Sequence, residues 1–192
     1  KASTGDWIAF LDADDEWLLD KLKLQIDHIH RHPELYWTFG NFSVYFGNQK
    51  KNKSAHENRT VSAAIIENEL TDDVFKAFEA GLFPWTGTVV IHRSVFEKTG
   101  MFEPGMKRAQ DNDLWYRIGY SYPKAGYLFS PLSIYHRDTP ESSTKVNSDI
   151  KFLIEMIDRH EKLSREAGRY EAFRPVISNM IKFWIRKLNR QK

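Results

Sequence analysis

Four acidic residues crowd the end of a short apolar stretch near the start of the chain. The stretch IAFLDADDEW begins like a buried strand and then carries Asp12, Asp14, Asp15 and Glu16. Carboxylates at this spacing repel one another, and they are tolerated when they are solvated, protonated or bound to a cation. A strand that ends in D-x-D places two carboxylates on the same side of an extended backbone. There they can share a divalent cation that also binds phosphate oxygens.

Two other uses of these acids are excluded by single residues. An EF-hand loop that began at Asp12 would need glycine and glutamate where the chain has Trp17 and Lys23. A D-x-D-x-T phosphatase site would need threonine in place of Glu16. A third use stays open, because the acids could simply cap and charge the helix that follows.

A second acidic group lies in QDNDLWYR, which begins a predicted helix. It carries Asp111 and Asp113, followed by Trp115. A carboxylate beside an aromatic side chain could accept a proton from a substrate hydroxyl. The alternative is an ordinary helix N-terminus, where acidic residues are favoured by the helix dipole.

The composition is that of a folded protein with one domain and a possible tail. The chain has 192 residues, of which 41% are hydrophobic and 28% charged. Its net charge of +2 gives no overall field for nucleic acid. The absence of cysteine excludes disulfides and thiolate metal sites. No apolar run is long enough to span a bilayer.

Strand and helix patterns alternate at first and are then mixed, which indicates an α/β domain. Strands are predicted over 7–11, 35–47, 85–92 and, as two strands broken at Pro131, 125–137. Helices are predicted over 18–30, 71–80, 93–100, 110–122, 146–166 and 170–190. The first helix should bury a face made by Leu18, Leu22, Ile26 and Ile29. The second should be capped by Thr71 or Asp72.

Taken together, the two acidic segments resemble a known family. FLDADDEW, followed further on by TGTVVIHRSVFEKTGMFEPGMKRAQDNDLWYRIG, is similar to the family 2 glycosyltransferases of the GT-A fold. In that family one segment carries the D-x-D motif and the other the catalytic carboxylate. The resemblance covers residues 5–137. It implies a GT-A mixed sheet flanked by helices, with a partial transferase domain over 1–145 and a helical extension over 146–192.

The resemblance also implies roles for individual residues. Asp14 corresponds to the ligand of the Mn²⁺ or Mg²⁺ that holds the donor diphosphate, and Asp12 to a residue near that metal or the donor ribose. Asp111 corresponds to the general base that deprotonates the acceptor hydroxyl. The implied reaction moves one sugar from a nucleotide-sugar donor to a glycan or lipid-linked acceptor. With one base and no second nucleophile evident, direct displacement with inversion is the simpler mechanism.

Other site residues are also predicted, and an explanation without a site role stays open for several of them. His136 and Arg137 fall where the family has a loop that closes over the pyrophosphate, although an exposed loop would look the same. Trp85 resembles an acceptor-side aromatic, and a core tryptophan is the alternative. Asp113 and Trp115 are predicted on the acceptor side.

The sequence departs from the family pattern in three ways. Gln110 replaces the glutamate before the base. No Q-x-x-R-W motif is present, which disfavours a processive synthase. The family's nucleotide-binding strand–helix–strand unit does not precede Lys1, so we expect the C-terminal portion of a larger enzyme. A non-catalytic glycan-binding or assembly module on a truncated transferase fold is the alternative function. A metal-binding α/β protein with a fortuitous likeness is a third.

The end of the chain is basic. From Ala172 onward there are six lysines and arginines and no acid. NMIKFWIRKLNRQK places Met180, Phe183 and Trp184 near one helix face and basic residues on another. Such a helix could lie on an anionic membrane or pack on its own domain. We expect a cytoplasmic enzyme, at the inner face of the membrane if this helix binds there. Self-association through an exposed strand edge is also open.

Overall fold

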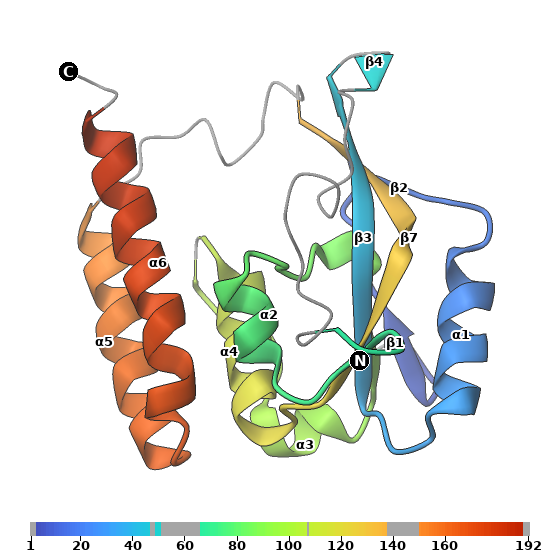
Figure 1. Ribbon diagram of the computed structural model, residues 1–192, viewed down its shortest axis with the longest axis horizontal. Coiled ribbons are helices and arrows are strands. Elements are labelled where there is room, and N and C mark those ends of the chain that lie inside the picture. Colours follow the sequence, from blue (N-terminus) through green and yellow to red (C-terminus); the bar gives the residue numbers. More distant parts are fainter. Residues whose placement is uncertain (1–2, 47–48, 51–65, 107, 138–149, 190–192) are drawn as a thin grey trace.

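A mixed β-sheet organises the molecule (Figure 1). The computed structural model describes residues 3–46, 49–50, 66–106, 108–137 and 150–189. The strands are β1 (Trp7–Ala9), β2 (Glu16–Trp17), β3 (Trp37–Phe46), β4 (Gln49–Lys50), β5 (Leu70–Thr71), β6 (Val90–His92) and β7 (Ala125–His136). Their order is β1-β6-β3-β7-β2, with β4 beside β3 and β5 beside β7. The central pair β3–β7 is parallel and the other pairs are antiparallel.

Helices cover both faces of this sheet. They are α1 (Lys21–Arg31), α2 (Val74–Glu79), α3 (Val95–Thr99), α4 (Gln110–Ser121), α5 (Ile150–Glu166) and α6 (Tyr170–Asn189), with a 3₁₀ turn η1 at Thr86–Thr88. In Figure 1, α1 lies on one side of the sheet and α2, α3 and α4 on the other. The antiparallel pair α5–α6 forms an outer layer, packed on α4 and α2. The predicted α/β class is confirmed.

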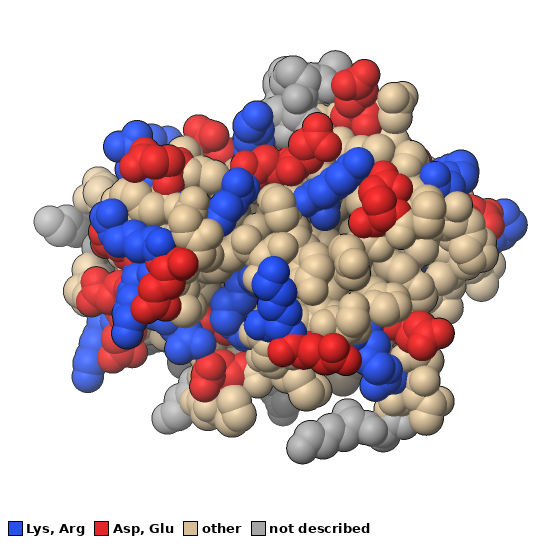
Figure 2. All heavy atoms as spheres, turned by 90° about the horizontal axis from the view of Figure 1, so that it is seen from below, with Lys and Arg blue, Asp and Glu red and all other residues tan. Residues whose placement is uncertain are grey.

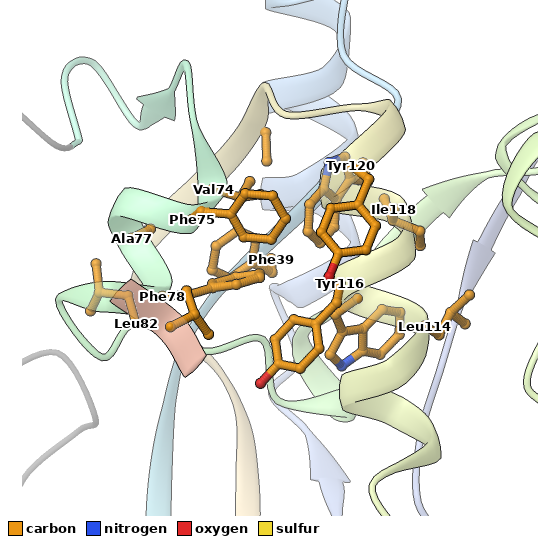
Figure 3. Close-up of a cluster of buried hydrophobic side chains, with 14 of the residues drawn as sticks. Phe39, Val74, Phe75, Ala77, Phe78, Leu82, Leu114, Tyr116, Ile118 and Tyr120 are labelled. Carbon is orange, nitrogen blue, oxygen red and sulfur yellow. The ribbon is translucent and has the colours of Figure 1, made fainter. Parts of the chain in front are cut away.

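The main core lies between the sheet, α2 and α4 (Figure 3). Phe75 and Phe78 of α2 meet Phe39 of β3 on one side and Tyr116 and Tyr120 of α4 on the other. These rings are almost completely buried. Their burial fixes α4 against the sheet, and with it the acidic first turn of that helix.

The helix α1 buries a different face from the one that its apolar pattern predicts. Lys21, Gln25 and His28 are buried, whereas Leu22 is 44% exposed. Gln25 explains this, because its amide donates to the Thr38 hydroxyl and the Thr88 carbonyl and accepts from Lys21. The buried polar groups are thus paired across α1, β3 and η1, and the predicted apolar face of α1 is wrong in part.

Three other local predictions need correction. The segment 125–137 is one strand rather than two, because β7 bulges where its register against β3 shifts between Gly40 and Phe42. Pro131 falls in that bulge, where no ladder N–H is required. The cap of α2 is Asp73, whose carboxylate accepts from the Phe75 N–H, and not Thr71 or Asp72. Only the end of the strand predicted over 85–92 forms a strand, β6, because Thr86–Thr88 form the 3₁₀ turn η1.

Candidate active site

The D-x-D segment forms a tight turn between β1 and β2. The Asp15 N–H donates to the Asp12 carbonyl at 3.1 Å, which closes the turn. Asp12 and Asp14 are exposed at its outer side, whereas Asp15 is buried. Asp12 and Asp14 are therefore the outward acids of this turn, and Asp15 is its inward acid.

Asp15 holds three segments of the chain together. One of its oxygens accepts from the Trp85 indole N–H at 2.6 Å, and the other accepts from the His136 backbone N–H at 3.1 Å. Burial raises the pKa of Asp15, and these two hydrogen bonds oppose that rise. The sequence showed Asp15 only as one more acid, since nothing in the segment distinguishes an inward carboxylate from an outward one.

The two acidic segments come together in the fold. Partial burial, with repulsion from Asp15, Asp111 and Asp14, raises the pKa of Asp12 to about 6. The contributions of the described residues all raise the pKa of Asp12. A site of this kind gains stability from a bound cation.

Asp111 lies in the first turn of α4. Its side chain accepts from the Asn112 N–H at 2.8 Å, and burial raises the pKa of its carboxyl. The residue before the helix, Ala109, has a left-handed backbone with φ 49°. That conformation is costly for alanine and turns the chain sharply into α4 just before Asp111.

Asp113 is buried in an ion network instead of facing the site. Its carboxylate accepts from Arg117 at 2.8 and 2.5 Å and from Arg159 of α5 at 2.7 Å. His160 lies 3.2 Å from the same carboxylate. Burial raises the pKa of Asp113, but bonds from His160, Arg117 and Arg159 outweigh it and hold the pKa well below its usual range.

The imidazole of His160 lies between Tyr120 and Asp113 in this network. Burial lowers the pKa of its imidazole, although Asp113 opposes the shift. The Tyr120 hydroxyl lies 3.1 Å from Nδ1, and Asp113 lies on the Nε2 side. Arg159 and His160 were not predicted from the sequence as partners of Asp113, because they come from a helix far along the chain.

The burial of Asp113 does not support its predicted contact with an acceptor. Asp113 and Trp115 each have no exposed surface in this structure. The reason is that α4 is buried on almost all sides from residue 113 onward, since residues 113–116 and 118–120 are all buried. Asp111, two positions earlier, is the acid of this segment that retains exposed surface.

Trp85, His136 and Arg137 lie along one edge of the same region. The Trp85 ring packs against Tyr135 with 3.9 Å between ring centroids, in addition to its bond with Asp15. The His136 imidazole lies 2.9 Å from Glu16. Arg137 is exposed and lies over Phe46. Trp85 and His136 thus adjoin the D-x-D turn, and the rest of the predicted pyrophosphate loop, 138–144, lies outside the described residues.

A divalent cation fits the chemistry of the outward acids. Asp12 and Asp14 offer the carboxylate oxygens that Mn²⁺ and Mg²⁺ accept as ligands. Among the described residues, no group of three histidine, aspartate or glutamate side chains could hold a metal ion. Two carboxylates could supply part of the coordination of such a cation, and other ligands would have to supply the rest.

Comparison with known proteins identifies the family. The family model for glycosyl transferase family 2 matches residues 1–100, which is more than half of the chain. The chain belongs to glycosyl transferase family 2. A comparison with curated protein sequences found no match. None of the described helices is long and apolar enough to cross a membrane.

Solved structures show that this family 2 chain has the GT-A fold. The crystal structure of S. aureus TarS 1-349 in complex with UDP-GlcNAc matches with a TM-score of 0.67 and 13% identity. The match covers 93% of this chain and 48% of that one, so this chain spans about half the length of the TarS structure. Structures of S. aureus TarS (14% identity, 88% of this chain and 29% of that one) and of TarS 1-349 (12%, 94% and 68%) match with TM-scores of 0.49.

Proposed function

We propose that this family 2 chain transfers a single sugar from a nucleotide-sugar donor to a glycan or lipid-linked acceptor. The observation that carries the proposal is the meeting of Asp12 and Asp111, two acids from distant segments that repel each other in the fold. One acidic segment would hold the donor diphosphate and the other would act on the acceptor. TarS, whose fold this chain shares, was crystallised with UDP-GlcNAc, which supports a nucleotide sugar as the donor class.

Asp14 and Asp12 would hold Mn²⁺ or Mg²⁺ at the D-x-D turn. When bound, the cation would offset the negative charge that develops on the departing nucleoside diphosphate. The buried Asp15 keeps this turn in place through Trp85 and β7. His136 and Arg137, at the end of β7, would contact the donor phosphates.

Asp111 would be the general base. It would accept the proton of an acceptor hydroxyl as that oxygen attacks the anomeric carbon, while the bond from that carbon to the diphosphate breaks. A single displacement of this kind inverts the anomeric configuration. Burial raises the pKa of Asp111, which makes its carboxylate a stronger base than an exposed aspartate. Trp85 is partly buried and would offer its remaining surface to the acceptor.

Two substitutions separate these roles. Asp14→Asn should abolish metal-dependent donor binding, and Asp111→Asn should retain binding but lose release of nucleoside diphosphate from a panel of UDP- and GDP-sugars. Asp20→Asn is the matched control, because Asp20 is an exposed acid without a capping bond. Activity of both the Asp14 and the Asp111 variant equal to that of the unmodified chain would contradict the assignment. Donor binding without turnover in the unmodified chain, across acceptors, would favour the non-catalytic module.

A further inference from the structure

The chain enters α4 through a backbone conformation that has to be held in place. We call residues 100–109 the entry segment. Gly100 begins it with φ 71°, and Ala109 ends it with φ 49°. Glycine adopts a positive φ readily, whereas alanine does so at a cost. Such a conformation persists only where surrounding contacts fix it, so the position of Asp111 depends on what holds the entry segment.

Arg117 of α4 holds the start of the entry segment. Its guanidinium donates to the Thr99 carbonyl and, at 2.9 Å, to the Met101 carbonyl. The same guanidinium donates to the Asp113 carboxylate. At the other end of the segment, the Asp113 N–H donates to the Ala109 carbonyl at 2.9 Å. The two ends of the entry segment are thus fixed by α4 itself.

Arg159 of α5 holds the middle of the entry segment. Its Nη2 donates to the Glu103 carboxylate at 2.8 Å, and its Nε donates to the Asp113 carboxylate at 2.7 Å. One guanidinium therefore joins the entry segment to the first turn of α4, which also carries Asp111. We call these two contacts the Arg159 bridge. The planar fork of arginine makes both bonds in one fixed geometry.

The Arg159 bridge differs from the ion pairs at the surface of the molecule. Arg165 of the same helix pairs with Glu161 at 2.7 Å, and the two side chains are 55% and 41% exposed. Figure 2, which looks at the lower side of Figure 1, shows basic and acidic side chains mixed over that face. Exposed pairs contribute little to stability. The Asp113 carboxylate of the Arg159 bridge is instead fully buried, so the bridge reaches from the surface into the interior.

The helix that carries Arg159 is itself anchored beside the bridge. The next residue, His160, is buried, and its imidazole lies 3.1 Å from the Tyr120 hydroxyl and 3.2 Å from the Asp113 carboxylate. In Figure 1, α5 lies alongside α4, and the two helices are in contact. A shift of α5 along α4 would break these contacts. Arg159 therefore acts on the entry segment from a fixed support.

We propose that Arg159 is a positioning residue for Asp111. It acts through Glu103 and Asp113, which keep the costly conformation at Ala109 and so place Asp111 in the candidate active site. Arg159 itself takes no part in the chemistry. This inference rests on the proposed function, because it concerns the general base of that reaction. It also gives the helical extension a role in transfer.

Arg159→Gln removes the Arg159 bridge and tests this role. Release of nucleoside diphosphate is measured well below the melting temperature of each variant, so that every chain stays folded. We expect kcat to fall about 100-fold, as a small displacement of a reacting group can cause, while the donor KM is unchanged. Without donor or metal, exchange of the backbone amides of residues 100–112 should become faster, because the entry segment is released.

Three further variants separate positioning from stability. Val176→Ala shortens a fully buried side chain of α6, so it should lower the melting temperature and leave kcat unchanged. Arg165→Gln removes the exposed arginine of α5 and should change neither. Arg159→Lys keeps a positive charge beside Asp113 but loses the fork. This variant should fold and have a kcat between those of Arg159→Gln and the unmodified chain.

The inference alone fails if the unmodified chain turns over donor and Arg159→Gln has the same kcat. If Arg159→Gln does not fold, Arg159→Lys decides in the same way. A loss of kcat in Val176→Ala as large as that in Arg159→Gln would also overturn it, since the effect would then follow stability. A fall in kcat without faster amide exchange would overturn it too, because Arg159 would then contact the substrate directly. Absence of turnover in the unmodified chain would instead reject the proposed function, and the positioning role with it.

Discussion

Removing the charge of Asp113 should destabilise the protein strongly, although Asp113 lies outside the proposed chemistry. Asp113→Asn keeps the size of the side chain but leaves Arg117 and Arg159 without their buried anion. Breaking a buried ion pair by removing one partner costs about 3–5 kcal/mol. We expect the lower end, about 3 kcal/mol, because Arg159 retains Glu103 at 2.8 Å and Arg117 retains the Met101 carbonyl at 2.9 Å.

Urea unfolding followed by tryptophan fluorescence measures this loss. Asp27→Asn is the control, since Asp27 is exposed and pairs with Lys23 at 2.7 Å, and its loss should be hardly measurable. The pKa of Asp113 is lower in the folded state than in the unfolded state. Its stabilisation is therefore present above its unfolded pKa of about 3.9 and is lost as pH falls below that value. The reasoning is refuted if Asp113→Asn costs no more than Asp27→Asn, or if their difference is unchanged down to pH about 2.

Three further predictions follow from buried or crowded groups. Burial lowers the pKa of Lys21 to about 8, so its charge is unfavourable in the folded protein. Lys21→Met should therefore raise the free energy of unfolding at pH 7 by about 1–2 kcal/mol, after the loss of the hydrogen bond to Gln25 is subtracted. In urea unfolding, this gain should shrink as the pH rises from about 8 to 10.5. Gly40→Ala should lower the melting temperature and cost about 1–3 kcal/mol, because its new Cβ would lie 2.7 Å from the Leu128 carbonyl oxygen, whereas Gly5→Ala should change little. Asp12→Asn should stabilise the metal-free protein at pH 7 by at most about 1 kcal/mol, because the raised pKa of this exposed residue makes its charge unfavourable. Thermal scans should show this gain vanish as the pH falls from about 6 to about 4. Added Mn²⁺ should stabilise only the unmodified chain.

The sequence predicted the elements well where their patterns are local. The strand at Trp7, the helix that ends at Gly100 and the helix that begins at Gln110 are all confirmed. Gly100 has φ 71°, the left-handed conformation expected of a glycine that closes a helix. These features depend on residues that are neighbours in the sequence, so the chain alone indicates them.

The predictions failed for side chains whose burial depends on residues that are distant in the sequence. The burial of Lys21 depends on Gln25 and, through it, on Thr38 and Thr88, and no helical pattern in 18–30 shows those partners. Asp113 was predicted as a site residue from its place beside Asp111. In the fold it pairs with Arg159 and lies beside His160, and both of these residues belong to α5.

The roles within the D-x-D turn followed the same rule. Asp12 and Asp14 were predicted from spacing and are exposed as that role requires. Asp15 owes its inward position to Trp85 and to the end of β7, which the sequence does not place beside it. The spacing of the acids therefore did not indicate which of them is buried.

The central claim is that the outward acids of the D-x-D turn hold a cation that binds a nucleoside diphosphate. Calorimetric titration of UDP, and then of GDP, with and without Mn²⁺, tests it most directly, with Asp14→Asn beside the unmodified chain. The account predicts binding of one nucleotide that requires Mn²⁺ and is lost in the variant. Binding that is equal without Mn²⁺ or in the variant, or no binding of either nucleotide, would contradict it.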